Sequence, residues 1–214
     1  MVEEVIRKLF AILCWSAIFI STARSHQLDE YVQATLVEIE PSCIRLSINL
    51  TPGVEIADRV LKLIDADSDG SISQFELIAY AELLTRDLSI RLDGRDVELQ
   101  VAETYSSETN DLKEGWGIIQ CEYIISPIAL SPGAHKFSFA NRHMRSVGVY
   151  LFNAARPISS KIQISKQHRN TNQSNCEIDF NCHPSKSDTS VRGILFPATI
   201  FIAAVCICLR FYNK

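Results

Sequence analysis

The sequence predicts an α+β fold: an antiparallel β-sandwich-like domain into which one helix–loop–helix is inserted. Apolar and polar residues alternate with a period of two along several segments, which is typical of half-buried strands. Between two such segments, residues 55–86 change to helical spacing on both sides of an acidic turn. The 214 residues also begin and end with apolar runs, so the length between those runs predicts a single folded domain over 26–165.

The strands are expected in chain order between clusters of turn residues. The clearest runs from Ile44 to Thr51, where four aliphatic side chains alternate with polar ones. Residues 88–92 and 97–101 flank an Asp93-Gly94 pair, a strong signal for a hairpin with a tight turn. Further strands are predicted at 31–39, 117–125, 135–140, 147–152 and 161–165.

Two helices are predicted on either side of residues 65–76. In 55–64, Val60, Leu61 and Ile64 share one helical stripe, while charged side chains lie mostly elsewhere. Apolar residues also recur at helical spacing through 74–85.

The segment between these helices has the pattern D-x-[DN]-x-[DN]-G-x₅-E at every specified position. Short acidic side chains at alternate positions converge on one cation, and Gly70 provides the sharp turn. Four carboxylates in one loop repel each other unless a cation lies between them, which favours metal binding over a simple acidic turn. The predicted ligands are Asp65, Asp67, Asp69, the Ser71 carbonyl, Ser73 or a water that it holds, and Glu76.

These residues resemble the EF-hand family over about 55–86, and the resemblance implies Ca²⁺ as the bound ion. EF-hands usually occur in pairs, and so do the calcium loops of dockerins, yet the sequence contains no second loop. A single hand lacks a partner that preorganises it. We therefore expect weak to moderate affinity, toward the ~10⁻⁴–10⁻³ M of extracellular modules.

Two longer stretches, 26–41 (HQLDEYVQATLVEIEP) and 141–157 (NRHMRSVGVYLFNAARP), are similar to segments of uncharacterised bacterial exported EF-hand proteins. Some of those proteins are similar to the extracytoplasmic domain of hydrogenase/urease accessory-type membrane proteins. This second resemblance implies an alternative role as an accessory component of a nickel-type transition-metal transport system. His26 would be its metal ligand if it became the mature N-terminus, although an exposed histidine without a metal is the simpler interpretation.

The N-terminal residues 1–25 have the order of a secretory signal peptide. Arg7 and Lys8 precede an apolar run and then small residues, which predicts cleavage after Ser25, or alternatively after Ala23. An uncleaved anchor helix is the remaining alternative.

The C-terminal region predicts a membrane anchor. Residues 166–192 are polar and are expected to form a stalk, and the uncharged apolar run 193–209 is long enough for a transmembrane helix. The basic tail 210–214 follows it, as expected on the cytoplasmic side. The predicted protein is thus a single-pass cell-membrane protein with its main domain extracytoplasmic, either periplasmic or extracellular.

Four cysteines, Cys43, Cys121, Cys176 and Cys182, lie in the predicted extracytoplasmic part. Their pairing cannot be deduced from the sequence, although Cys176 and Cys182 are close enough along the chain to close a small loop within the stalk.

Other functions receive little support from the sequence. The net charge of −4 argues against nucleic acid as a partner. The chain contains no nucleophile elbow, phosphate-binding loop or Cys-x-x-Cys motif, so an enzyme is not expected. The expected partners are a calcium ion and the membrane, and no protein partner can be named.

Overall fold

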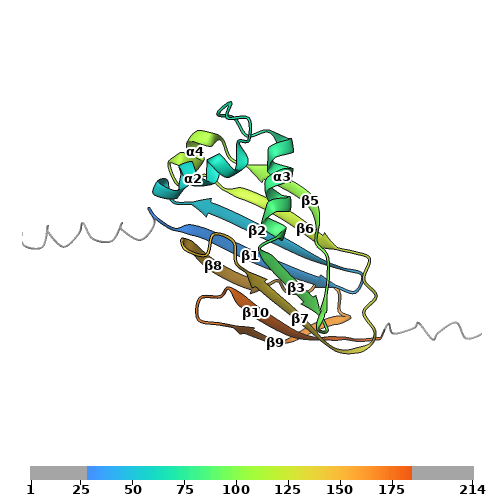
Figure 1. Cartoon of the computed structure of the whole chain (residues 1–214). Coiled ribbons are helices and arrows are strands. Elements are labelled where there is room, and N and C mark those ends of the chain that lie inside the picture. Colours follow the sequence, from blue (N-terminus) through green and yellow to red (C-terminus); the bar gives the residue numbers. More distant parts are fainter. Residues whose placement is uncertain (1–27, 185–214) are drawn as a thin grey trace, which may run out of the picture. The chain divides into compact units, whose positions relative to one another are not determined.

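The computed structural model describes residues 28–184, whose strands form two five-stranded sheets (Figure 1). The helices are α2 (Val54–Ile64), α3 (Gln74–Thr85) and α4 (Thr109–Lys113). The strands are β1 (Tyr31–Glu40), β2 (Cys43–Pro52), β3 (Leu88–Leu92), β4 (Arg95–Asp96), β5 (Gln100–Ser106), β6 (Ile119–Ile125), β7 (Gly133–Asn141), β8 (Gly148–Ala154), β9 (Ile162–Arg169) and β10 (Asn175–Cys182). This mixture of helices and antiparallel-rich sheets confirms the predicted α+β class.

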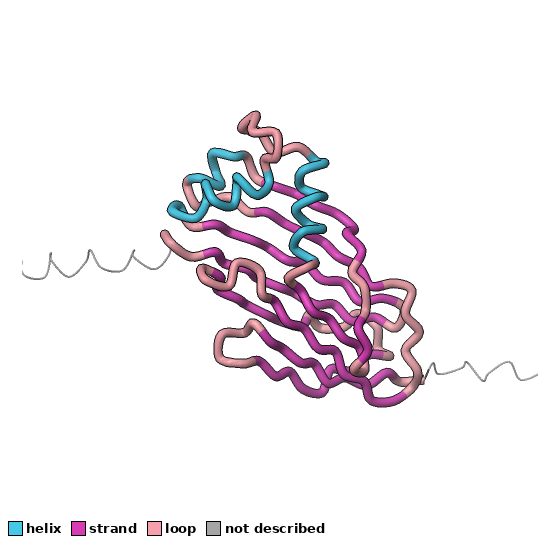
Figure 2. Tube along the Cα trace, in the orientation of Figure 1, coloured by secondary structure: helices cyan, strands magenta, loops and turns pink. Residues whose placement is uncertain are grey.

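The first sheet has the strand order β5-β6-β2-β1-β8, and the second has the order β4-β3-β7-β10-β9. All pairs are antiparallel except β1 and β8, which run parallel. Figure 2 shows the helices gathered in the upper part of the molecule, and α3 runs alongside the strands, packs against β5 and continues into β3. The helix–loop–helix is therefore an insertion between β2 and β3 that packs against the first sheet through α3.

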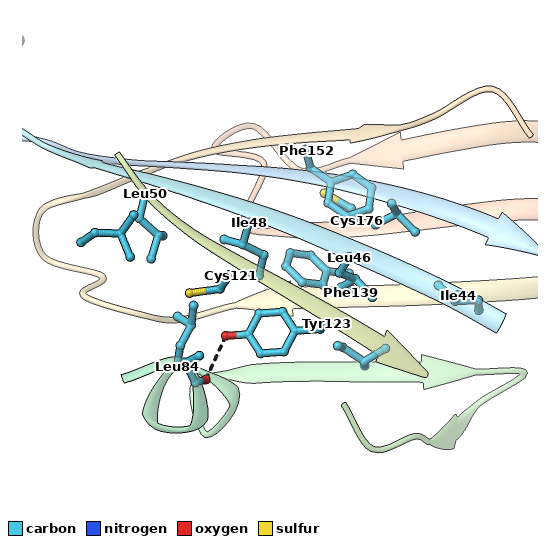
Figure 3. Close-up of a cluster of buried hydrophobic side chains, with 14 of the residues drawn as sticks. Ile44, Leu46, Ile48, Leu50, Leu84, Cys121, Tyr123, Phe139, Phe152 and Cys176 are labelled. Atoms are coloured by element: carbon cyan, nitrogen blue, oxygen red, sulfur yellow. Dashed lines mark hydrogen bonds between the residues drawn. The ribbon is translucent and has the colours of Figure 1, made fainter. Parts of the chain in front are cut away.

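A single apolar core joins the inward faces of both sheets. Along β2 the even-numbered residues Ile44, Leu46, Ile48 and Leu50 are fully buried, which confirms the predicted alternation. Figure 3 shows these side chains clustered with Tyr123 and Phe152 of the same sheet and with Phe139 of the other sheet. Burying one such aliphatic side chain stabilises the fold by about 1.5–3 kcal/mol.

The hairpin predicted around Asp93-Gly94 is only partly correct. The turn itself forms, with positive φ at both residues, as a two-residue type I′ connection requires. The returning strand β4 has two residues, and the chain then leaves this sheet to form β5 in the other one. Val97 and Leu99 pack against the core at the crossing, where the Val97 N–H still donates to the Ile90 carbonyl at 3.1 Å, and Val101 already belongs to β5.

The stalk predicted for 166–192 is wrong for its first part. Residues 166–169 belong to β9, and β10 follows as its antiparallel partner at Asn175–Cys182. Ile178 and Phe180 are buried on the core face of β10. A strand added to an existing sheet needs only a few apolar side chains on one face, because its neighbours supply the rest of the core.

A disulfide between Cys176 and Cys182 is excluded by the same strand. The two residues are six positions apart on β10, or about 20 Å at the rise of a strand. A disulfide requires Cα atoms within about 7 Å of each other. All four cysteines of the described residues are free thiols, and burial raises the pKa of Cys121 and of Cys176 to about 11.

Helix α4, which the sequence pattern does not predict, is a short turn between β5 and β6. Its Leu112 is fully buried, and α4 packs against α2. Gly117 follows closely, and a Cβ at that position would lie 2.6 Å from the Leu112 backbone nitrogen. The Gly117 N–H donates to the Asp111 carbonyl at 2.8 Å rather than to a neighbouring strand, and the predicted strand 117–125 begins only at Ile119.

The predicted signal peptide, transmembrane helix and cytoplasmic tail lie outside the described residues, as does the rest of the predicted stalk from 185 onward. Within 28–184, none of the helices has the length and apolar character needed to cross a membrane.

Candidate metal centre

Helices α2 and α3 bracket the predicted loop, as the sequence pattern requires. Helix α2 buries Ile56, Val60 and Ile64 and ends at Asp65, whose backbone N–H donates to the Leu61 carbonyl at 2.8 Å. Helix α3 begins directly after Ser73. The loop therefore leaves one helix at its first predicted ligand and enters the next just before its last.

The start of α3 is a capping box. The Ser73 hydroxyl accepts a hydrogen bond from the Glu76 backbone N–H, and the Glu76 carboxylate accepts one from the Ser73 backbone N–H at 2.9 Å. A carboxylate in the first turn also interacts favourably with the positive end of the helix dipole. Glu76 thus has a structural role at the helix terminus in addition to its predicted role as a ligand.

The turn of the loop depends on two residues in the left-handed region of φ. Gly70 has φ +84°, a conformation that costs glycine little, and no heavy atom lies within 4 Å of where its Cβ would be. Ser68 has φ +60°. The loop needs glycine at position 70 for its backbone conformation rather than for lack of space.

Three of the predicted ligands converge. Ligand oxygens of Asp65, Asp67 and Glu76 all lie within 4.8 Å of one another. Calcium binds oxygen at 2.3–2.6 Å, so two ligands of one ion lie at most about 5 Å apart. The spacing of these three carboxylates therefore fits one shared Ca²⁺.

Backbone N–H groups fix the orientation of these carboxylates. The two oxygens of Asp65 accept from the N–H groups of Asp69 at 3.1 Å and Gly70 at 3.0 Å, and Asp67 Oδ1 also accepts from Asp69 at 3.2 Å. Glu76 Oε1 accepts from Ala66 at 2.7 Å. A carboxylate offers about four lone-pair sites, so each of the three retains acceptor capacity for a cation.

The other predicted ligands are placed differently. Asp69 lies outside the cluster of three, and its Oδ1 accepts from the Ser71 backbone N–H at 2.7 Å. The Ser73 hydroxyl donates to Glu76 Oε2 at 2.8 Å. Ser71 is exposed in the loop. The cluster contains half of the predicted set.

Glu76 is held in its ionised form. The backbone N–H of Ser73, then its hydroxyl, then the N–H of Ala66 lower the pKa of the Glu76 carboxyl below its ordinary value. Hydrogen bonds to the charged form stabilise it. The negative charge that a cation requires is therefore present at neutral pH and below it.

Strand β5 supports the loop from the side. Ile72 of the loop is partly buried against the core. The Gln74 side chain donates to the Thr104 hydroxyl at 2.8 Å, which joins the start of α3 to β5. This contact holds the start of the second helix of the helix–loop–helix against the first sheet.

A buried hydrogen-bonded chain, which the sequence analysis did not find, lies further along α3. The Tyr80 hydroxyl is 2.8 Å from that of Tyr31 and 3.0 Å from His143 Nε2, and His143 Nδ1 is 2.7 Å from Asp87 Oδ2. Burial lowers the pKa of His143 and outweighs the opposing effect of Asp87. Neutral His143 donates from Nδ1 to Asp87 and accepts at Nε2 from Tyr80, which accepts from Tyr31 in turn.

The backbone of His143 is held by a second set of buried polar groups. The Gln33 side-chain amide and the Tyr150 hydroxyl both donate to the His143 carbonyl at 2.9 Å, and Asn141 Oδ1 accepts from its N–H. Every buried side-chain nitrogen and oxygen in the described residues has a partner. The whole arrangement, which we call the tyrosine–histidine network, joins α3 to both sheets and reaches the surface at Asp87.

The residue of the transition-metal alternative, His26, lies outside the described residues, so that role stays a prediction from the sequence. Comparison of the chain with protein-family models, curated protein sequences and solved structures finds no match in any of the three. The resemblance to EF-hands thus depends on the loop residues themselves.

Proposed function

We propose that this protein is a calcium-binding module with a single EF-hand and a structural or interaction role. The convergence of Asp65, Asp67 and Glu76 within 4.8 Å, between two helices, is the observation that supports it. The proposal includes the extracytoplasmic location and C-terminal anchor that the sequence predicts. A catalytic role is not part of it.

Calcium is favoured over smaller or softer ions by the ligands available. All three converging groups are carboxylates, which hard cations prefer, and the described residues around them contribute no thiol or imidazole to the cluster. The flexible, exposed loop suits the 6–8 oxygen ligands of Ca²⁺ better than the strict octahedron of Mg²⁺. Water molecules would supply the remaining ligands on its open side.

Bound calcium would stabilise the domain through α3. Asp65 caps the C-terminal end of α2, and Glu76 lies in the first turn of α3. One ion bound by both carboxylates would neutralise their repulsion and fix the angle between the two helices. A ligand that binds only the folded state stabilises it by about 2.7 kcal/mol at a concentration of 100 Kd.

Calorimetric titration of the full-length chain in detergent, with Ca²⁺ and with Mg²⁺, tests the proposal together with thermal unfolding. We expect one calcium per chain, weaker magnesium binding, and a melting temperature that rises with calcium. Glu76→Gln should abolish both effects. The matched control is Glu82→Gln on the exposed side of α3, which removes the same charge outside the loop and should bind like the wild type.

A melting temperature that does not respond to millimolar calcium would contradict the proposal. Equal calcium binding by Glu76→Gln and the wild type would place the ion somewhere other than this loop.

A further inference from the structure

A groove lies on the outer face of the second sheet, away from the core. Its volume is about 480 Å³, and it crosses β3, β7, β10 and the end of β9. This volume falls within the range of small-molecule sites, about 300–1,000 Å³. None of its lining residues belongs to the loop 65–76, so the groove is distinct from the candidate metal centre.

Strand register places one row of side chains across the groove. Arg91 pairs with Ser138, Ser138 with Glu177, and Glu177 with His168. Directly paired residues of neighbouring strands point to the same face of a sheet. The row thus presents Arg91 at one side and His168 at the other, with the Ser138 hydroxyl and the Glu177 carboxylate between them.

The next row forms the floor. Ser89 pairs with Ala140, which pairs with Asn175. These side chains are short, whereas Arg91, Glu177 and His168 of the neighbouring row are long. This difference in length makes the face concave. Arg142 follows β7 directly, two residues after Ala140, and lines the same groove.

The groove carries an excess of positive charge in a chain whose net charge is −4. Its one acidic lining residue is Glu177, whose Oε2 lies 3.1 Å from Lys136 Nζ, so that charge is already compensated. Arg91 bonds to Asp96 through Nε at 2.8 Å. Its two Nη groups still have four N–H donors for another acceptor.

We propose that this groove binds a small molecule through a phosphate group. Arginine guanidinium groups provide paired N–H donors that match phosphate oxygens. Arg91 lies on β3 and Arg142 directly after β7, and the Ser89 and Ser138 hydroxyls and the Asn175 amide offer further donors in the groove. Donors from several directions suit the tetrahedral oxygens of phosphate better than the planar pair of a carboxylate.

Titration of the full-length chain with inorganic pyrophosphate, in calcium-free buffer at fixed ionic strength, tests the site. Malonate, which also carries two anionic groups, is the comparison ligand. We expect pyrophosphate to bind at least tenfold more tightly than malonate. The double variant Arg91→Ala/Arg142→Ala should bind it at least tenfold more weakly than the wild type, while Arg59→Ala on the exposed side of α2 should change its affinity less than twofold.

Ser138→Asp gives a second, independent variant, because it adds a negative charge to the groove and leaves both arginines in place. It should also reduce pyrophosphate binding at least tenfold, with an unchanged melting temperature. The proposal is overturned if the wild type does not bind pyrophosphate up to about 10 mM, if malonate binds equally well, or if either groove variant binds like the wild type.

Discussion

Helix α3 carries two sites with opposite electrostatic properties, one in its first turn and one near its middle. Its first turn carries Glu76 beside Asp65 and Asp67, three carboxylates close together at the surface. Further along, Tyr80 lies in the buried tyrosine–histidine network, where each polar atom has a partner and burial holds His143 neutral. The polar groups of the network are paired with one another, whereas the carboxylates of the loop carry negative charge that a bound cation would neutralise.

One helix thus connects a site whose charge depends on a bound cation to a site whose polar groups are already paired within the protein. Glu76 and Tyr80 are four residues apart, about one helical turn, so both project from similar sides of α3. We therefore expect changes at the network to alter stability with or without calcium. Changes in the loop should alter mainly the response to calcium.

The largest effect is expected at the buried site, for Tyr80→Phe. Loss of this hydroxyl removes the hydrogen-bond partner of both Tyr31 and His143 Nε2. Leaving a buried polar group unpaired costs about 1–3 kcal/mol. Chemical denaturation should show this loss of unfolding free energy equally in calcium and in a chelator. A loss seen only with calcium would mean that the two sites on α3 are not independent.

A smaller effect is expected in the loop, for Gly70→Ala. The substitution forces a Cβ into a backbone conformation at φ +84°, which costs about 1 kcal/mol even though no neighbour blocks it. Because calcium binding requires that conformation, the calcium affinity should also fall. Ser71→Ala, one residue later, keeps the same backbone donors and should leave both quantities nearly unchanged.

The contributions of His143 and His135 to stability should respond to pH in opposite directions. In the network, burial lowers the pKa of His143. As the pH falls below the ordinary value of about 6.5, the unfolded chain takes up this proton before the folded one, so the contribution of His143 to stability is lost toward acid.

His135 differs because both of its ring nitrogens face acceptors, the Ser131 carbonyl and Asp93, each at 2.7 Å. Burial opposes the charged form, but these two hydrogen bonds outweigh it and raise the pKa of His135. Its contribution is therefore complete below about pH 6.5 and is lost as the pH rises through the raised value. NMR titration of the imidazole signals measures both histidines in one experiment, and the opposite order would contradict this account.

The smallest expected effect is a difference in calcium affinity between variants of two acidic loop residues, Asp67 and Asp69. Asp67 belongs to the converging cluster and Asp69 does not, since its carboxylate accepts from Ser71 instead. Calcium titration should show Asp67→Asn binding several-fold more weakly than Asp69→Asn. Equal losses would indicate that Asp69 turns toward the ion when calcium binds.

The features that the sequence predicts correctly are those in which the deciding residues are neighbours along the chain. The loop between Asp65 and Glu76 is contiguous, so its spacing and its bracketing helices are both visible in the pattern. The alternation in β2 is local in the same way. Which of the six loop residues converge is not visible, because that depends on hydrogen bonds from loop backbone groups.

The tyrosine–histidine network could not be predicted because its members are far apart in the sequence. Tyr80 and His143 are separated by 63 residues, and Gln33 and Asn141 by 108. The stalk prediction failed for a related reason. Polar composition in 166–182 concealed the alternation of Ile178 and Phe180 with acidic residues, whose significance depends on a neighbouring strand, β7, that lies far earlier in the chain.

The parallel pairing of β1 with β8 has a consequence for how the domain is made. Tyr31 is opposite Gly148, so the first strand has a neighbour on that side only after almost 120 further residues exist. Contacts between such distant parts of a chain slow folding, because a long loop must close before they form. A chain emerging from a ribosome or a translocation pore therefore holds an unfinished sheet edge at β1 until residues 148–154 arrive.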